Sequence, residues 1–203
     1  MNITFPKELV FATNNRHKLE EAAAILGSSV RILSLQDIDC REELPETKDT
    51  FEGNALQKAR YICDRYGVDC FADDSGLEVD ALGGSPGVYS ARYALLEGAA
   101  LQAHDDAANT RQLLRDLDGI ADRGAQFRTV TALILQGEEH LFEGTVRGTI
   151  TLSPAGEGGF GYDPVFIPEG YDRTFAQLLP EEKNSISHRA RSLAAMKKYL
   201  SPL

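Results

Sequence analysis

Two adjacent carboxylates, Asp73 and Asp74, are the residues of this chain best suited to chemistry. A short apolar run precedes them, and Ser75 and Gly76, a glycine that would permit a sharp turn, follow. Neighbouring acids at the end of a strand are costly unless a cation or strong hydrogen-bond donors compensate them. The pair therefore predicts a metal site in which one acid can also handle a proton. The alternative is a polar turn after a strand, because Asp, Ser and Gly all favour turns.

A second candidate is the polar segment Thr13-Asn14-Asn15-Arg16-His17-Lys18, which we expect to join a strand to a helix. Such a turn directs backbone N–H groups and the positive end of the helix dipole at one point. Asn14 and Asn15 can adopt a left-handed backbone or cap the helix, and Lys18 could reach an anion held there. The alternative is an ordinary polar cap with a solvated lysine. The sequence contains no GxxxxGK[ST] loop.

The segment from Glu46 to Ala59 supplies a third acid and another cation. Asn54 and Lys58 are four residues apart, so on a helix they share one face and could hold a phosphate together. Glu46 lies before that helix, in an expected loop. The alternative is that Asp49 or Thr50 caps the helix and Lys58 is solvated.

The glycine-rich segment 156–164 could carry the backbone close to a ligand, with Phe160 and Tyr162 offering ring faces for stacking. Pro164 predicts an extended backbone at Asp163. The alternative is a flexible surface loop. Farther along, Lys183 and the sequence Ser187-His188-Arg189 at a helix start add cations that could bind an anion or a base; His188 alone would most often be structural.

These segments need elements to position them, and the apolar patterns predict strands alternating with helices. The ranges expected are strands 9–13, 69–73, 77–82, 127–135 and 140–151, the last two as an antiparallel hairpin around Gly137, and helices 18–26, 51–66, 105–117 and 187–200. This order indicates an α/β fold around a mixed sheet. There is no internal repeat or linker, so residues 1–203 are expected to form a single domain.

The composition limits the class of partner. A net charge of -10 argues against a nucleic-acid polymer but permits a small phosphorylated ligand bound by a few cations in a cleft. No apolar run approaches the roughly 18 residues of a membrane span, so no membrane partner is expected. The first residues lack the apolar core of a signal peptide, and three cysteines without a CxxC pair suggest a reduced, cytoplasmic protein.

Taken together in this order, the segments resemble the inosine triphosphate pyrophosphatase family, from about Leu9 to Leu200. The residues that carry the resemblance are Thr13-Asn14-Asn15 with Lys18, Thr50-Phe51 with Asn54-Ala55 and Lys58-Ala59, Ala72 to Leu77, Gly83 to Tyr93, Gly159 to Pro164, and Glu182-Lys183 with Ser187-His188-Arg189. Each motif is weak alone, but the ordered set is specific.

The resemblance implies a mixed, curved sheet flanked by helices, in two lobes with the active site in the cleft between them. It implies Mg²⁺-dependent hydrolysis of ITP, dITP and XTP to the monophosphate and pyrophosphate, and a homodimer. Carried over by position, the resemblance makes Asp74 the catalytic base. It makes Glu46, Asp74 and Asp73 the metal ligands. The residues to which it assigns contacts with the substrate are Thr13, Asn14, Asn15, Arg16, His17, Lys18, Asn54, Lys58, Ser75, Phe160, Gly161, Tyr162, Asp163, Lys183, His188 and Arg189.

Two positions depart from the family pattern. Many relatives have glycine at the position of Asn14, where asparagine is the best substitute at positive φ. Many relatives have glutamate at the position of Gly53, and this chain lacks a carboxylate there. Glu46 would therefore be the more important metal ligand.

The resemblance leaves two rival functions. One is a related pyrophosphatase that acts on other triphosphates, and the other is a nucleotide sensor that does not hydrolyse its ligand. The acid pair and the lysines disfavour the sensor, because a sensor needs no catalytic base.

Overall fold

The computed structural model of the protein describes residues 8–27, 30–100 and 102–201. The strands are β1 (Glu8–Phe11), β2 (Arg31–Leu33), β3 (Cys70–Val79), β4 (Gly124–Leu135), β5 (Glu138–Ile150) and β6 (Phe166–Pro168). The α-helices are α1 (Arg16–Leu26), α2 (Phe51–Tyr66), α3 (Tyr93–Leu96), α4 (Asp106–Asp116), α5 (Pro180–Ile186) and α6 (His188–Leu200). Short 3₁₀ turns are η2 (Gln36–Ile38), η3 (Asp80–Leu82), η4 (Gly87–Arg92), η5 (Asp163–Val165) and η6 (Phe175–Gln177).

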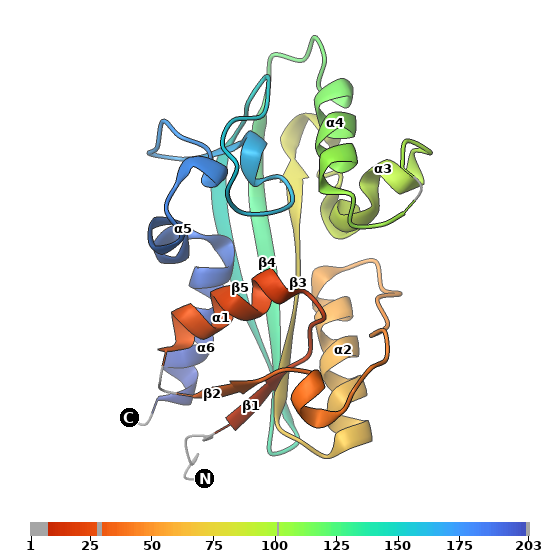
Figure 1. Ribbon diagram of the computed structural model, residues 1–203, viewed down its shortest axis with the longest axis vertical. Coiled ribbons are helices and arrows are strands. Elements are labelled where there is room, and N and C mark those ends of the chain that lie inside the picture. Colours follow the sequence, from red (N-terminus) through yellow and green to blue (C-terminus); the bar gives the residue numbers. More distant parts are fainter. Residues whose placement is uncertain (1–7, 28–29, 101, 202–203) are drawn as a thin grey trace. The chain divides into compact units, whose positions relative to one another are not determined.

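The strands of the described residues form a six-stranded sheet in the order β2-β1-β3-β4-β5-β6. Strand β1 runs parallel to β2 and β3, whereas β5 and β6 are antiparallel, so the sheet is mixed. The prediction of an α/β fold around a mixed, curved sheet with flanking helices is confirmed (Figure 1).

The chain divides into two compact units. The first unit comprises the described parts of residues 1–74, 129–144 and 188–203, and the second comprises those of 75–128 and 145–187. Two of the four boundaries fall inside predicted site segments, between Asp74 and Ser75 and between Ser187 and His188.

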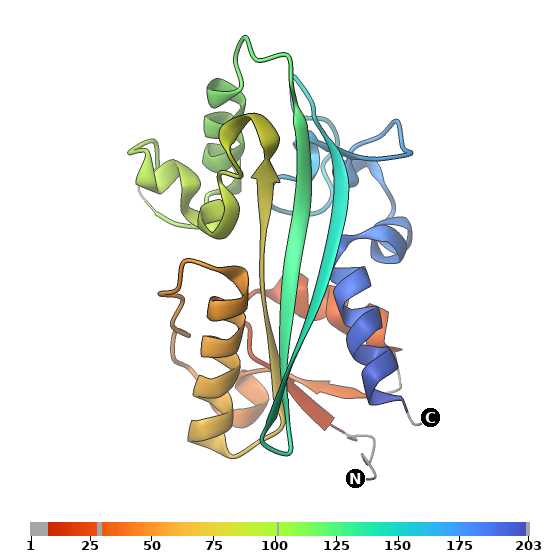
Figure 2. The same cartoon turned by 180° about the vertical axis from the view of Figure 1, so that it is seen from behind.

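In the first unit, helices cover both faces of the sheet. Phe11 of β1 packs with Ala22 of α1 and Met196 of α6, whereas its neighbour Val10 packs with Ile62 of α2. Alternate residues of a strand point to opposite faces, so β1, β3 and β4 in this unit each present one face to α1 and α6 and the other to α2 (Figures 1 and 2). This double burial explains the continuous apolar runs of these strands.

In the second unit, α4 and the segments after β5 close a separate apolar core. Leu113 of α4 and Leu117, which caps the helix, share this core with Leu77 of β3 and with Phe166 and Phe175. Three aromatic rings, those of Phe127, Phe166 and Phe175, contact one another within it.

The sequence predicted most elements of the fold. Helix α2 has the bounds expected, and the hairpin of β4 and β5 forms around Gln136 and Gly137 (Figure 2). Both turn residues have positive φ, 52° and 82°, as a two-residue type I′ turn requires. The short strands β2 and β6 escaped detection because three residues are too few to establish a periodic pattern.

The largest correction concerns β3. Its residues were expected to form two strands, 69–73 and 77–82, but they form one strand of 10 residues followed by the 3₁₀ turn η3. Gly76 does not mark a turn; a Cβ there would lie 2.2 Å from the Gly87 carbonyl oxygen and 2.5 Å from the Ser90 hydroxyl. Glycine is therefore needed for a close approach of η4 to the strand.

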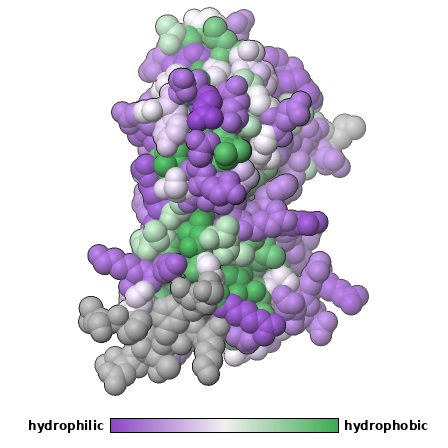
Figure 3. Space-filling view, turned by 60° about the vertical axis from the view of Figure 1, so that its left-hand side comes forward, coloured by the Kyte–Doolittle hydropathy of each residue, from purple (hydrophilic) through white to green (hydrophobic). Residues whose placement is uncertain are grey.

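The surface in Figure 3 is largely hydrophilic with smaller hydrophobic areas, as the composition suggests. Among the described residues, no helix combines the length and the apolar character needed to cross a membrane.

Candidate active site

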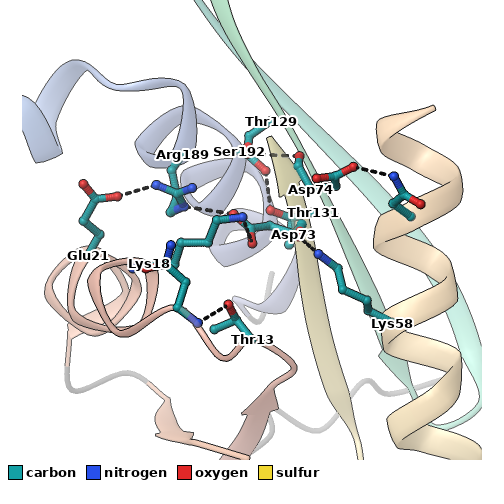
Figure 4. Close-up of polar contacts among 12 residues, drawn as sticks. Thr13, Lys18, Glu21, Lys58, Asp73, Asp74, Thr129, Thr131, Arg189 and Ser192 are labelled. Carbon is teal, nitrogen blue, oxygen red and sulfur yellow. Dashed lines mark hydrogen bonds and ion pairs between the residues drawn. The ribbon is translucent and has the colours of Figure 1, made fainter. Parts of the chain in front are cut away.

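Asp73 is the centre of a buried ion network in the first unit (Figure 4). Lys18 Nζ, from α1, lies 2.9 Å from Asp73 Oδ1, and Arg189 Nε, from α6, lies 2.9 Å from Asp73 Oδ2. The Asp73 and Arg189 side chains are each 1% exposed. Arg189 also pairs with Glu21 of α1. An acidic side chain can be buried this deeply because cations contact both of its oxygens.

These cations keep Asp73 ionised. Burial alone would raise the pKa of the Asp73 carboxyl, but Lys18, Arg189 and Lys58 outweigh it and hold that pKa well below its usual range. Asp73 is therefore a permanent anion at neutral pH and a poor candidate for accepting a proton.

Asp74 points to the other face of β3, toward α2. Asn54 Nδ2 donates to Asp74 Oδ2 over 2.9 Å, and the Thr129 hydroxyl donates to the backbone carbonyl of Asp74 over 3.3 Å. Burial raises the pKa of the Asp74 carboxyl, and the opposing attraction of Lys58 and Lys18 does not cancel this effect. A carboxylate with a raised pKa is the better proton acceptor of the two.

Lys58 connects the acid pair to Glu46. Its Nζ donates to the backbone carbonyl oxygen of Asp73 over 2.7 Å and also binds the Glu46 carboxylate. Burial would lower the pKa of Lys58, but Glu46, Asp74 and Asp73 outweigh it and raise that pKa. The alternative of a solvated lysine is wrong, because the Lys58 side chain is 6% exposed. Thr50 caps α2, as that alternative expected, by accepting a hydrogen bond from Gly53 N–H.

Of the predicted segment Thr13 to Lys18, which spans the connection after β1 and the start of α1, Lys18 is the residue that reaches the ion network in the contacts described above. Asn15 caps α1 by accepting from Lys18 N–H, and the Thr13 hydroxyl accepts from Asn15 N–H over 3.1 Å. Arg16 is exposed and pairs with Glu20 one turn along the helix; His17 is exposed as well.

The backbone of Asn14 differs from the expectation. Among the described residues, the positive φ values outside glycine belong to Asp39, His104 and Gln136, so Asn14 does not adopt a left-handed backbone. Its side-chain amide donates to the Glu42 carbonyl oxygen over 3.4 Å instead.

The second unit contains a compact group of polar and aromatic residues after β5. Asp163 Oδ2 accepts from Lys183 Nζ over 2.6 Å and from Phe160 N–H over 2.9 Å. Lys183 Nζ also lies 4.6 Å from the centre of the Phe160 ring. Gly159 has φ of 72°, and a Cβ there would lie 2.0 Å from Asp163 Oδ2, so glycine makes room for this carboxylate.

The backbone at Asp163 is not extended as Pro164 suggested. Asp163 begins the 3₁₀ turn η5, and its N–H donates to the Phe160 carbonyl oxygen. Tyr162 is a core residue, 3% exposed, whose hydroxyl donates to the Ser90 carbonyl oxygen over 2.9 Å. Phe160, which is half-buried, is therefore the better stacking surface of the two aromatic residues.

The remaining predicted residues lie at the boundaries of the two units. Ser75 is half-buried and follows Asp74 in β3, whereas His188 is buried at the start of α6. Arg189 is predicted to contact the substrate; in the structure its guanidinium donates to Asp73 and Glu21.

The acidic side chains of the first unit offer few ligands for a metal ion. Among the described residues, no group of three or more His, Cys, Asp or Glu side chains is arranged to hold a metal ion. Glu46 and Asp74 nevertheless face the same cation, Lys58, and are close enough for the charge of Glu46 to raise the pKa of Asp74. Two carboxylates suit Mg²⁺, which usually keeps several waters and takes further oxygens from substrate phosphates.

The structure thus brings together Lys18, Asn54, Lys58, Asp73 and Asp74 with Glu46 in the first unit, and Phe160, Asp163 and Lys183 in the second. Sequence reasoning missed Glu21, which pairs with Arg189, and Asp106, which binds the Gly161 backbone. Their spacing from Lys18 and from Phe160 offered no pattern that would have identified them.

Comparison with known proteins places this geometry in a family. A family model described as the Ham1 family matches residues 9–199. A Flavobacterium johnsoniae protein named dITP/XTP pyrophosphatase is 52% identical over 186 residues, which cover 92% of this chain and 94% of that protein. A Porphyromonas gingivalis protein of the same name is 52% identical over 195 residues, covering 96% of this chain and 97% of that one.

Solved structures give the same result. The Staphylococcus aureus Ham1 protein matches with a TM-score of 0.84 and 38% identity, over 96% of this chain and 98% of that one. The nucleoside-triphosphatase, or dITP/XTP pyrophosphatase, of Mycobacterium abscessus matches with a TM-score of 0.73 and 48% identity, over 93% and 98%. The resemblance found in the sequence motifs is confirmed, and the chain belongs to the Ham1 family.

Proposed function

We propose that this protein hydrolyses non-canonical purine nucleoside triphosphates, namely ITP, dITP and XTP, to the nucleoside monophosphate and pyrophosphate. The observation that carries the proposal is the arrangement of Lys18 and Lys58 around the Asp73–Asp74 pair. The names of the relatives, dITP/XTP pyrophosphatase, support the substrate class.

In the proposed reaction, a water molecule attacks the α-phosphorus, an O–P bond forms, and the bridging bond to the β-phosphate breaks to release pyrophosphate. Asp74 accepts the proton of that water, a contribution typically worth about 10²–10⁴-fold in rate. Its raised pKa and its hydrogen bond to Asn54 support this role. Asp73 has a different role, because as a permanent anion it holds Lys18 and Arg189 in place.

Lys18 and Lys58 neutralise phosphate oxygens and the negative charge that develops on the departing pyrophosphate. Both lysines are bound by acids of the first unit, so their positions are fixed before the triphosphate arrives. Glu46 and Asp74 would hold Mg²⁺, with Asp73 a less suitable ligand because cations contact both of its oxygens. When bound, Mg²⁺ would offset the charge of the triphosphate and polarise the attacked phosphoryl group.

For the base, we propose that Phe160 stacks on the purine and that Lys183 donates to the 6-oxygen of hypoxanthine or xanthine. Adenine has an amino donor at that position, and the mismatch would leave a buried donor without an acceptor. The ammonium of Lys183 beside the Phe160 ring supports this arrangement. The N–H groups of Phe160 and Asp163 are the weaker candidates, because both donate within the turn.

We also propose that the protein is a cytoplasmic homodimer, as the resemblance implies. The molar mass in solution, measured by light scattering, tests the dimer. The three cysteines are free, which supports a reducing compartment.

The decisive experiment measures pyrophosphate release from ITP, XTP, dITP, GTP, ATP and dUTP, each with Mg²⁺ and with excess EDTA. We expect the first three to be hydrolysed with the highest kcat/KM, and only with the metal. Equal kcat/KM for ITP and ATP would refute the substrate class in favour of a broader pyrophosphatase. Binding of nucleotides without any release of pyrophosphate would favour the sensor.

A further inference from the structure

Few hydrogen bonds within the turn from Phe160 to Asp163 fix its backbone conformation. Phe160 N–H donates to Asp163 Oδ2, and Asp163 N–H donates to the Phe160 carbonyl oxygen over 3.2 Å. Gly161, in the middle of the turn, has φ of 62°. Since glycine residues leave the backbone many accessible conformations, contacts from outside the turn are needed to select this one.

Asp106 supplies such a contact from the first turn of α4. Gly161 N–H donates to Asp106 Oδ2 over 2.7 Å, a short, charge-assisted hydrogen bond in a half-buried position. Thr110, one helical turn along α4, places its hydroxyl 3.5 Å from the Gly161 carbonyl oxygen, at the limit of a hydrogen bond. One face of α4 therefore contacts both polar groups of the residue that follows Phe160.

Helix α4 does not need Asp106 for its N-cap. That role belongs to Asp105, whose side chain accepts from Ala108 N–H over 2.9 Å. The helix is attached to α3 and to η4 by Asn109, which accepts from Ala94 N–H and donates to the Ala91 carbonyl oxygen. The two neighbouring aspartates thus have separable roles, one toward the helix and one toward the turn.

We propose that Asp106 is a positioning residue for purine recognition: it holds the Gly161 peptide so that Phe160, Asp163 and Lys183 keep the geometry that reads a 6-oxopurine. This inference rests on the proposed function and deepens it. In this proposal Asp106 acts through the Gly161 backbone and has no assigned contact with the base or the phosphates, so its removal should weaken base recognition and leave the chemistry of the triphosphate unchanged.

The test compares Asp106→Ala, Asp106→Asn and Asp105→Ala in the whole chain of residues 1–203. Losing the charge-assisted hydrogen bond should raise the KM for ITP in Asp106→Ala by about tenfold and lower the kcat/KM ratio of ITP to ATP. The kcat for ITP should stay within about twofold, because the transition-state contacts at the phosphates are retained. Competitive inhibition by inorganic pyrophosphate, which has no base, should be unchanged.

The other two variants separate positioning from general support. An asparagine oxygen can still accept from Gly161 N–H, so Asp106→Asn should recover most of the KM and the selectivity. Asp105→Ala should lower the melting temperature through loss of the helix cap while keeping the KM and the selectivity of the wild type.

Two kinds of result would overturn the inference, and they are distinguishable. If the wild type releases no pyrophosphate from ITP, the proposed function fails and the inference fails with it. If the wild type is active but Asp106→Ala keeps its KM and selectivity, or if Asp105→Ala raises the KM equally, only the inference fails.

Discussion

The carboxylates of Asp73 and Asp74 lie on opposite faces of β3, although the two residues are neighbours in the sequence. Asp73 meets Lys18 and Arg189 on the side of α1 and α6, whereas Asp74 meets Asn54 on the side of α2. The alternation of a strand produces this separation. It gives one acid a structural charge network and leaves the other in surroundings that favour accepting a proton.

The first prediction concerns Asp74. Asp74→Asn removes the proton acceptor but keeps the shape of the side chain, so kcat for ITP should fall by about 10²–10⁴-fold. Nucleotide affinity measured without Mg²⁺ should change little, because Lys18 and Lys58 remain. Pyrophosphate release gives kcat, and calorimetric titration with ITP gives the affinity.

Asp64→Asn is the matched control, since Asp64 is an exposed acid on α2. Its kinetics should equal those of the wild type. Near-normal turnover by Asp74→Asn would rule out Asp74 as the base.

The second prediction concerns stability and its dependence on pH. Asp73→Asn leaves Lys18 and Arg189 without their shared anion, so the free energy of unfolding at pH 7 should fall by about 3–5 kcal/mol. Because the pKa of Asp73 is lower in the folded than in the unfolded protein, its contribution is complete above the unfolded value, about 4, and is lost as the pH falls below it.

Urea unfolding at pH values from 7 to 3 measures this contribution. The wild type should lose stability on acidification more steeply than Asp73→Asn does. Asp118→Asn, which alters an exposed acid, should follow the wild type. Parallel pH curves for the wild type and Asp73→Asn would show that the ion network contributes no linked stability.

The sequence predicted the elements and the candidate residues better than their contacts. Helix α2 was predictable from the spacing of its apolar residues, and the hairpin from two β-rich runs around Gly137. The placement of Asp73 and Asp74 on opposite faces of one strand could not be predicted, because the Asp-Ser-Gly composition favoured a turn. In the structure, Gly76 instead allows Gly87 to lie close to the strand. Contacts such as that of Glu21 with Arg189, 168 residues apart, depend on tertiary packing and leave no local pattern.

The third prediction concerns the metal. Removing the charge of Glu46 in Glu46→Gln should raise the Mg²⁺ concentration for half-maximal activity by about tenfold or more. Activity at saturating Mg²⁺ should recover at least in part, because Asp74 and the substrate phosphates still offer oxygen ligands. Glu43→Gln, in the same loop and exposed, should keep the metal requirement of the wild type. An unchanged requirement in Glu46→Gln would remove Glu46 from the metal site.

The fourth prediction concerns the base. Phe160 is half-buried and lies against Lys183, so its ring is placed for stacking on one side of a purine. Stacking of a base on an aromatic side chain is worth about 1–3 kcal/mol, so Phe160→Leu should raise the KM for ITP about tenfold. Phe160→Tyr should retain most of the affinity.

Inhibition by inorganic pyrophosphate provides the internal control. It depends on Lys18 and Lys58, so it should be equal in the wild type and both variants. A KM of Phe160→Leu equal to that of the wild type would mean that the purine is bound elsewhere. A parallel loss of pyrophosphate inhibition would mean that the substitution disturbs the phosphate site and does not report on stacking.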